Sequence, residues 1–223
     1  DSQLTQSIVE LNPDDFLIKP FTTKELETRL RRVLNRKLLL HAVFDAVESQ
    51  QYEKALEEIN VVIAENENPK FMTVLMKLKG EILAANQNWP QAESFYLSVL
   101  KVKEFEWAEL VLLESLVKQG KVEDIDGNMK SLINRAATRL NAHELLAQMH
   151  EQRNEFDAAL KHISQAAEIA PRNIERQQHL VGLARVTYDY DTLHLAANNI
   201  IKNLKNSYYE TPDSYLTAVR ANV

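Results

Sequence analysis

Hydrophobic residues recur along most of the chain at helical spacing and divide it into short amphipathic segments. Two examples are "YEKALEEINVVIAE", which starts at Tyr52, and "FDAALKHISQAAEIAP", which starts at Phe156. In both, apolar residues return every three or four positions, which places them on one face of an α-helix. Short polar stretches such as "ANQN" and "EQRN" separate the segments, and the chain has only four glycines and six prolines. The pattern predicts an all-α fold of helices joined by short turns.

These segments repeat along the sequence. Five times, a large residue is followed three positions later by a small or aliphatic one, and the successive first members lie 37, 33, 34 and 34 residues apart. The pairs are Tyr52/Ala55, Trp89/Ala92, Val122/Ile125, Phe156/Ala159 and Tyr190/Leu193. We expect each pair to open the second helix of a helix-turn-helix unit. The large residue would wedge between the two helices, and the small residue would let them approach closely.

The repeat resembles the tetratricopeptide repeat (TPR) family, from about Leu38 to Leu204. Further matches are Gly80, Tyr96, Gly120 in a turn, and "AEIAP" ending at Pro171. The resemblance implies a right-handed solenoid of about five helix pairs that bury their apolar faces by stacking. An irregular helical bundle is the alternative. The stretch "TPDSYLTAVRA" predicts a last helix, capped by Thr211 with Pro212 at its first position, that closes the stack.

The TPR resemblance also implies that the first helices of the repeats line a concave groove that binds a protein or peptide. Projecting those helices gives a mixed set of residues for this groove: Lys77, Glu81, Glu114, Lys118, Glu144, Gln148 and Arg185. Chaperone-binding members of the family concentrate Lys, Arg and Asn there to clamp two carboxylates, and that concentration is absent. We therefore predict a protein partner without specifying its chemistry.

The head of the chain has a different pattern. In "PDDFLIKPFTTKELETRLRRVLNRK", from Pro13 to Lys37, the apolar stretch Phe16–Ile18 predicts a short buried strand that runs into Lys-Pro. Thr22 and Glu25 then have capping-box spacing, which predicts a helix that starts just after Thr22. No Gly or Pro follows until after Ser49. We therefore expect one helix from Thr23 to about Ser49, which would run from the head directly into the first repeat.

This head resembles the end of the receiver domain of response regulators. The resemblance implies that Lys19 contacts the phosphoryl group, that Pro20 follows a cis peptide bond, and that "SQLTQSIVELN" is the preceding helix. In that family the phosphorylated aspartate and the magnesium-binding acidic pair lie on earlier strands, which are not in this sequence. We therefore expect a truncated α/β receiver remnant, cut from a longer protein, with magnesium only in the complete receiver and no cofactor in this chain.

These resemblances give three regions: a receiver remnant at 1–37, TPR-like repeats at 38–204 and a capping helix at 205–223. The last helices and strand of receivers form a face that dimerises or meets partners. Because Arg29, Arg32 and Arg36 lie on the last receiver helix, we take them as a candidate dimer face. The commoner interpretation of such a basic run is a solvated helix face.

Composition and charge narrow the function classes. The chain has 26 Lys and Arg against 32 Asp and Glu, a formal net charge of −6, and residues 1–37 carry +1 of it. The rest of the chain is therefore acidic, whereas the phosphates of nucleic acid require a basic surface, so the charge does not favour nucleic-acid binding. The absence of cysteine excludes disulfides and thiolate chemistry. No apolar run approaches the roughly 20 residues that cross a bilayer, and no secretory signal is visible, so we expect a cytoplasmic protein that does not bind membranes.

Six histidines raise the question of catalysis or metal binding. His143 and His150 are two helical turns apart, about 10 Å, which is too far to share a metal without other ligands. Phosphotransfer on His41 or His143 stays open as an alternative function, as does nucleic-acid binding through the basic helix 29–37. The favoured interpretation is a non-enzymatic adaptor, the output region of a two-component response regulator. Its partner would be a histidine kinase or another signalling protein, and it would form a homodimer through the receiver remnant.

Overall fold

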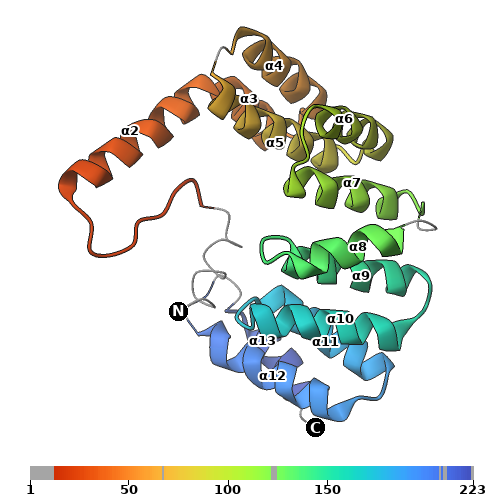
Figure 1. The fold of residues 1–223 in the computed structure, drawn as a ribbon. Helices are drawn as coiled ribbons and strands as arrows, with labels where there is room; N and C mark the ends of the chain where they lie inside the picture. Colours follow the sequence, from red (N-terminus) through yellow and green to blue (C-terminus); the bar gives the residue numbers. More distant parts are fainter. Residues whose placement is uncertain (1–12, 67, 122–124, 206, 208–209, 222–223) are drawn as a thin grey trace. The chain divides into compact units, whose positions relative to one another are not determined.

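The structure, a computed structural model, describes residues 13–66, 68–121, 125–205, 207 and 210–221. These residues form helices and connecting segments and contain no strand. The chain divides into two compact units, one within Asn12–Gln119 and one within Gly120–Val223, each described here by itself. The first contains α2 (Thr23–Leu39), α3 (His41–Glu48), α4 (Tyr52–Glu65), α5 (Pro69–Ala85), α6 (Trp89–Val102) and α7 (Glu106–Lys118) (Figure 1). The second contains α8 (Ile125–Asn134), α9 (Arg139–Gln152), α10 (Phe156–Ile169), α11 (Ile174–Val186), α12 (Tyr190–Leu204) and α13 (Pro212–Ala221).

The helix boundaries confirm the predicted repeat. Four of the five large residues are the first residues of second helices: Tyr52 of α4, Trp89 of α6, Phe156 of α10 and Tyr190 of α12. The fifth, Val122, lies outside the described residues. The small partners Ala55, Ala92 and Ala159 are at most 1% exposed, as a close approach of two helices requires. The wedging role of Tyr190 was wrong, because this residue is 61% exposed and the buried stripe of α12 begins one turn later, at Leu193.

Each turn within a repeat contains one residue in the left-handed backbone region. The five residues are Gln50, Gln87, Gly120, Asn154 and Tyr188, and their spacing follows that of the repeat. The N–H of Gln50 donates to the carbonyl of Val47, and the N–H of Gln51 donates to the carbonyl of Ala46. The same two bonds recur at Gln87, Asn154 and Tyr188, and together they define the Schellman motif that ends a helix. A regular backbone turn therefore sets each second helix, although only Gly120 and Asn154 are residue types that favour this conformation.

Each unit has its own hydrophobic core. In the unit containing α2 to α7, the largest fully buried side chains include Ile59, Leu75, Ile82 and Tyr96. In the other unit, Ile163, Leu180, Ile200 and Leu204 belong to a cluster drawn from α9 to α12. Tyr215 of α13 packs against this second cluster, and Thr211 accepts a hydrogen bond from the backbone of Ser214. Both observations agree with the predicted capping helix.

The single helix predicted from Thr23 to Ser49 is broken at Leu40, which ends α2 and precedes α3 with φ −100° and ψ 10°. The break follows a change of apolar face. The stripe of α2 runs through Leu30, Leu34 and Leu38, whereas the first buried position of α3, Val43, lies about 140° around a continuous helix from Leu38. Leu40 itself is 1% exposed, so the bend directs it into the core. The ring Nδ1 of His41 lies 2.9 Å from the carbonyl oxygen of Leu38, to which it donates.

The predicted strand Phe16–Ile18 is not formed, and the prediction that it is buried was wrong. Phe16 is 42% exposed and Ile18 is 74% exposed. No described strand lies beside the segment to form a ladder, and its backbone bonds side chains instead: the N–H of Phe16 donates to Asp15, and its carbonyl accepts from Arg29. The Lys19–Pro20 bond is cis, as the receiver resemblance implies. The predicted helix at "SQLTQSIVELN" lies outside the described residues.

The start of α2 is as predicted. Glu25 donates its backbone N–H to the hydroxyl of Thr22, and the Glu25 carboxylate accepts from the backbone N–H of Thr22, which completes a capping box. This reciprocal pair satisfies donors that the first turn of a helix would otherwise leave unpaired. The hydrogen bond from Thr22 also lowers the pKa of the Glu25 carboxyl.

Gly80 is a position where two helices of one repeat lie in close contact. A Cβ atom there would lie 1.8 Å from the hydroxyl oxygen of Tyr96 on α6, whereas a Cβ at Gly182 on α11 would meet nothing within 4 Å. We predict that Gly80→Ala destabilises the protein by about 1–3 kcal/mol through overpacking. The matched change Gly182→Ala should stabilise it by about 0.5–1 kcal/mol, because alanine is the better helix former. Urea denaturation of both variants measures the difference, and equal effects would contradict the close contact.

Candidate partner-binding residues on the first helices of the repeats

The residues predicted to bind a partner all lie on first helices of the repeats, but they divide between the two units. Lys77 and Glu81 are on α5, and Glu114 and Lys118 are on α7. Glu144, Gln148 and Arg185 are on α9 and α11 of the other unit. Each set is therefore a candidate site within its own unit.

In the first unit, the Glu114 side chain is partly buried, whereas the Glu81 side chain is exposed at the surface. Burial raises the pKa of Glu81, opposed by the cation of Lys77 one turn before it, and burial raises the pKa of Glu114, opposed by Lys118 one turn after it. Neither carboxylate has a hydrogen bond or an ion pair with the described residues. Because neither carboxylate is paired within the described chain and Glu114 is partly buried, this pair is open to a cationic or hydrogen-bond-donating ligand.

Tyr96 connects these two carboxylates. Burial raises the pKa of its hydroxyl, and the negative charges of Glu114 and Glu81 raise it further. Both carboxylates therefore act on one buried phenol, which is 1% exposed and stands on α6 against Gly80. The first helices α5 and α7 thus each carry a carboxylate whose charge acts on the buried Tyr96 of the second helix α6.

Trp107 is part of this site, and sequence reasoning did not select it. The ammonium of Lys77 lies 5.4 Å from the centroid of the Trp107 ring, and the rings of Tyr96 and Trp107 meet edge to face at 6.1 Å. The indole Nε1 is buried and has no hydrogen-bond partner among the described residues. One signal was available: Trp107 is seven residues before Glu114, two turns along the same helix face. The site is therefore a mixed-charge surface with an aromatic wall.

The predicted residues of the second unit are engaged differently. Glu144 accepts from Arg176 of α11 at 2.8 Å, and this arginine, 4% exposed, also donates to the carbonyl of Ala170. The ion pair joins α9 to α11, so the Glu144 carboxylate is already paired within the chain. Gln148 has a buried Oε1 without a hydrogen-bond partner among the described residues, and Arg185 is exposed.

Three histidines of the second unit meet between α9 and α10. The Nδ1 atoms of His143 and His162 are 3.1 Å apart, and the ring of His150 stacks on that of His162 with centroids 5.4 Å apart. His150 also contacts the carboxylate of Glu155 at 2.6 Å. His162 thus fills the space between two histidines that the sequence places about 10 Å apart. Among the described residues no group of three or more His, Asp or Glu is arranged to hold a metal ion.

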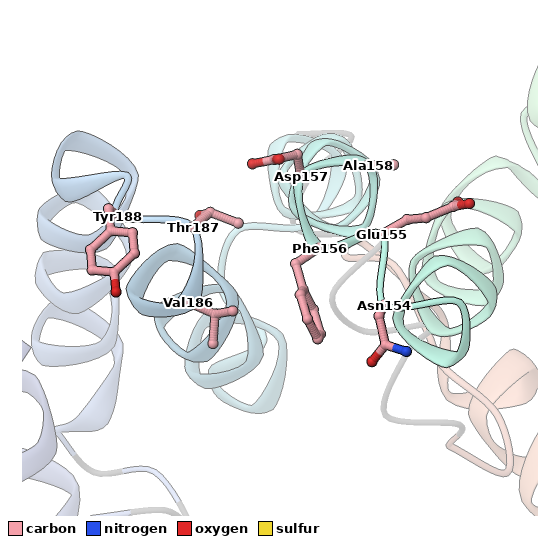
Figure 2. Close-up of a pocket in the computed structure, with 8 residues that line it drawn as sticks. All are labelled: Asn154, Glu155, Phe156, Asp157, Ala158, Val186, Thr187 and Tyr188. Carbon is pink, nitrogen blue, oxygen red and sulfur yellow. The ribbon is translucent and has the colours of Figure 1, made fainter.

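A separate hollow of about 600 Å³ lies beside the turns of the last two repeats. Its lining includes the left-handed residues Asn154 and Tyr188, and Figure 2 shows the Phe156 ring pointing into the space between Val186 and Asn154. None of the seven residues predicted to bind a partner lines it. We therefore place no predicted function there.

The candidate dimer face on α2 is occupied within the chain by an acidic pair. Asp15 forms ion pairs with Arg29 and Arg32, and Asp14 forms ion pairs with Arg36 and Lys37. Hydrogen bonds from Lys37 and Arg36 lower the pKa of Asp14. These contacts hold the segment that begins at Pro13 along α2. The receiver-like residues Lys19 and Pro20 line an open hollow with Phe21 and are both exposed.

Comparisons with known proteins support the fold and no more. No protein-family model matches the sequence, and no curated protein matches it. Two solved structures of MamA, a TPR protein, are similar. The "ArsTM double mutant" of MamA RS-1 aligns with a TM-score of 0.54 and 16% identity over 83% of this chain and 93% of that chain. MamA from residue 41 to its end, from Desulfovibrio magneticus RS-1, aligns with a TM-score of 0.54 and 18% identity over 77% and 97%.

The class that the fold defines is therefore a TPR-like helical repeat. At these identities the similarity to MamA shows the fold alone. In the part of the chain that the structure describes, no helix is long and apolar enough to cross a membrane.

The two open carboxylates predict a change in stability. Because ionisation of a desolvated carboxyl disfavours the folded state, Glu114→Gln should raise the thermal midpoint at pH 7.5, by about 2–4 °C for each kcal/mol gained. The sign follows from a folded pKa above the unfolded one, so the gain should shrink as the pH falls and the native carboxyl is protonated. Differential scanning calorimetry measures it, with Glu57→Gln at an exposed position of α4 as control. A loss of stability in the Glu114 variant would show that the carboxylate has a stabilising partner.

The pair His143 and His162 predicts that the protein loses stability as the pH falls, which is the opposite of the trend expected from Glu114. Burial lowers the pKa of His143, with the charge of Arg139 adding to it, and lowers the pKa of His162 to about 4, with the charges of His143, His150 and Lys161 adding to it. The unfolded chain binds these protons more readily, so stability present above about pH 6.5 should be lost progressively toward pH 4. We expect the melting temperature of His162→Gln, relative to that of the native protein, to be higher at pH 5 than at pH 7.5. An equal difference at both values would contradict the burial of a neutral pair.

Proposed function

We propose that this chain is the output region of a two-component response regulator. Its TPR-like repeats would bind another signalling protein, and the phosphorylation state of a receiver would control that binding. In this proposal the region is a non-enzymatic adaptor whose partner is a histidine kinase or a related signalling protein. The observation that carries the binding role is the open carboxylate pair of Glu81 and Glu114 beside the Trp107 wall.

The receiver part of the proposal rests on the head of the chain. The Lys19-Pro20-Phe21 motif follows an apolar stretch and leads directly into a helix with a capping box. None of the side chains of α2 is buried, and Leu26, Leu30, Leu34 and Leu38 are between 43% and 71% exposed along one face. A receiver's last helix presents such a stripe to the sheet that it covers, which supports this assignment.

The break at Leu40 supplies a route for control. A signal that moved α2 would act on α3 through one residue whose side chain is fixed in the core of the first repeat. The angle between α2 and α3 can therefore change without unfolding either helix. We expect the receiver to use this change of angle to shift the population of repeats that can bind the partner.

Hydrogen exchange on the full-length protein tests this control. With a phosphoryl mimic such as beryllium fluoride bound, we expect altered protection over α2, α3 and the helices around Glu81 and Glu114. Lys19→Ala should abolish the alteration, because the proposed contact with the phosphoryl group is lost while the repeats keep their fold. Unchanged protection throughout would overturn control by phosphorylation and leave a constitutive scaffold.

A binding assay with the kinase of the same signalling system separates the two halves of the proposal. Charge reversal in the double variant Glu81→Lys with Glu114→Lys should weaken binding but leave the exchange response to the phosphoryl mimic intact. Full binding by this variant would show that the partner lies elsewhere on the protein.

Phosphotransfer on His41 is the second candidate. The His41 ring is exposed and donates from Nδ1 to Leu38, which leaves Nε2 without a described partner. His143, the other candidate, is 6% exposed with its Nδ1 against His162, and an incoming phosphoryl group would have to displace that contact. Incubation with a phosphorylated receiver decides the question, since absence of label on any histidine removes this function.

A further inference from the structure

A second interaction surface lies on the same unit, away from Glu81 and Glu114. It is a groove of about 820 Å³ between α2 and the start of α5, and its two sides differ in chemistry. Arg31, Arg32 and Arg36 form a basic side on α2, and Phe71 and Val74 of α5, with Leu39, supply apolar surface. We propose that this groove binds an acidic amphipathic helix of a partner protein.

The length of the groove sets the length of its occupant. The lining on α2 extends from Thr28 to Leu39, which at 1.5 Å per residue is about 16 Å. That distance corresponds to about three turns of a helix laid alongside. A helix with acidic residues on one face and apolar residues on the other can meet both sides of the groove at once.

The charge of the basic side is only partly neutralised within the chain. From Pro13 to Leu39 there are seven Lys and Arg against four Asp and Glu, although the whole chain carries −6. Among the described residues, Arg31 is paired only with Glu27 of its own helix, and their side chains are 75% and 58% exposed. An ion pair so exposed contributes little, so an incoming carboxylate can replace Glu27 at small cost. The Arg32 side chain is 69% exposed beside its contact with Asp15.

Two other occupants fit less well. A second copy of this chain that presented its own α2 would bring arginines against arginines. Nucleic acid would match the basic side but would leave Phe71 and Val74 without a role, because duplex phosphates offer no apolar surface to them. The acidic amphipathic helix is the occupant that uses both sides.

The test uses three fluorescent probes with the whole chain. The first is a stapled 12-residue helix with Glu on one face and Leu on the other, the second is the same helix with Lys in place of Glu, and the third is a 20-base-pair DNA duplex. Fluorescence anisotropy should show saturable binding of the Glu/Leu helix, weaker at high salt, and little binding of the Lys/Leu helix.

Variants locate the binding. Arg31→Glu should weaken binding of the Glu/Leu helix at least about fivefold, and Val74→Thr should weaken it about two- to threefold through the apolar side. Lys101→Glu, an equal charge change at an exposed position of α6, should leave it unchanged. Thermal melts check that each variant is folded.

Three outcomes would overturn the proposal. One is failure of the native chain to bind the Glu/Leu helix, and another is equal binding by the native chain and Arg31→Glu. The third is binding of the DNA duplex in preference to the helix, lost in Arg31→Glu, which would assign the basic side to nucleic acid. Since none of these probes involves a receiver or a phosphoryl group, the result is independent of the adaptor function proposed above.

Discussion

The close approach of two helices after a left-handed turn is the constraint on which each repeat depends. Gly80 illustrates the approach, because the Tyr96 hydroxyl occupies the place where any larger residue would put its Cβ. The turn before α6 fixes the direction of that helix through the left-handed Gln87 and its pair of backbone hydrogen bonds. Together they bring the Tyr96 ring against α5, where it also meets the Trp107 ring of α7 edge to face. The candidate binding site is therefore a consequence of how the repeat is closed.

A different interaction organises the head of the chain. Asp14 and Asp15 each contact two cations of α2, so four basic side chains are held by two acidic ones. These exposed pairs contribute little stability singly, but they fix the direction in which the segment runs along the helix. They also bring three features of α2 close together. The faces overlap, because Arg32 and Arg36 both hold this segment and line the groove beside Phe71 and Val74, while Leu26 and Leu30 of the leucine stripe lie beside the segment.

The helix pairs were predictable from the sequence because the repeat pattern is local. A large residue that starts a helix and an alanine one turn later leave a signal wherever they occur, and Tyr52 with Ala55 or Phe156 with Ala159 shows it plainly. The break at Leu40 was missed because no Gly or Pro marks it, and only the shift of the apolar stripe between Leu38 and Val43 could have indicated it. The predicted strand failed because a strand needs a neighbour, which a local apolar pattern does not provide.

The candidate sites were predicted less completely than the fold, since they depend on contacts between helices. Projection of single helices selected Glu144 as open to a partner, but Arg176, thirty-two residues later in the chain, holds it. It also separated His143 from His150 without showing that His162 of the next helix fills the space between them. Trp107 was overlooked because an aromatic residue on a helix usually belongs to the core. Such contacts between helices become visible only when the helices are placed together.

Trp107 gives the protein an optical property. The chain has two tryptophans, and one of them is a partly buried indole beside the Lys77 ammonium and the Tyr96 ring. Indole emission responds to nearby charge and to water, so a ligand that displaced Lys77 or bound the two carboxylates would alter the fluorescence of that residue. The other tryptophan, Trp89, begins α6 and adds a second emission in the same band. Occupancy of the candidate site is therefore readable from the unmodified protein, without an added label.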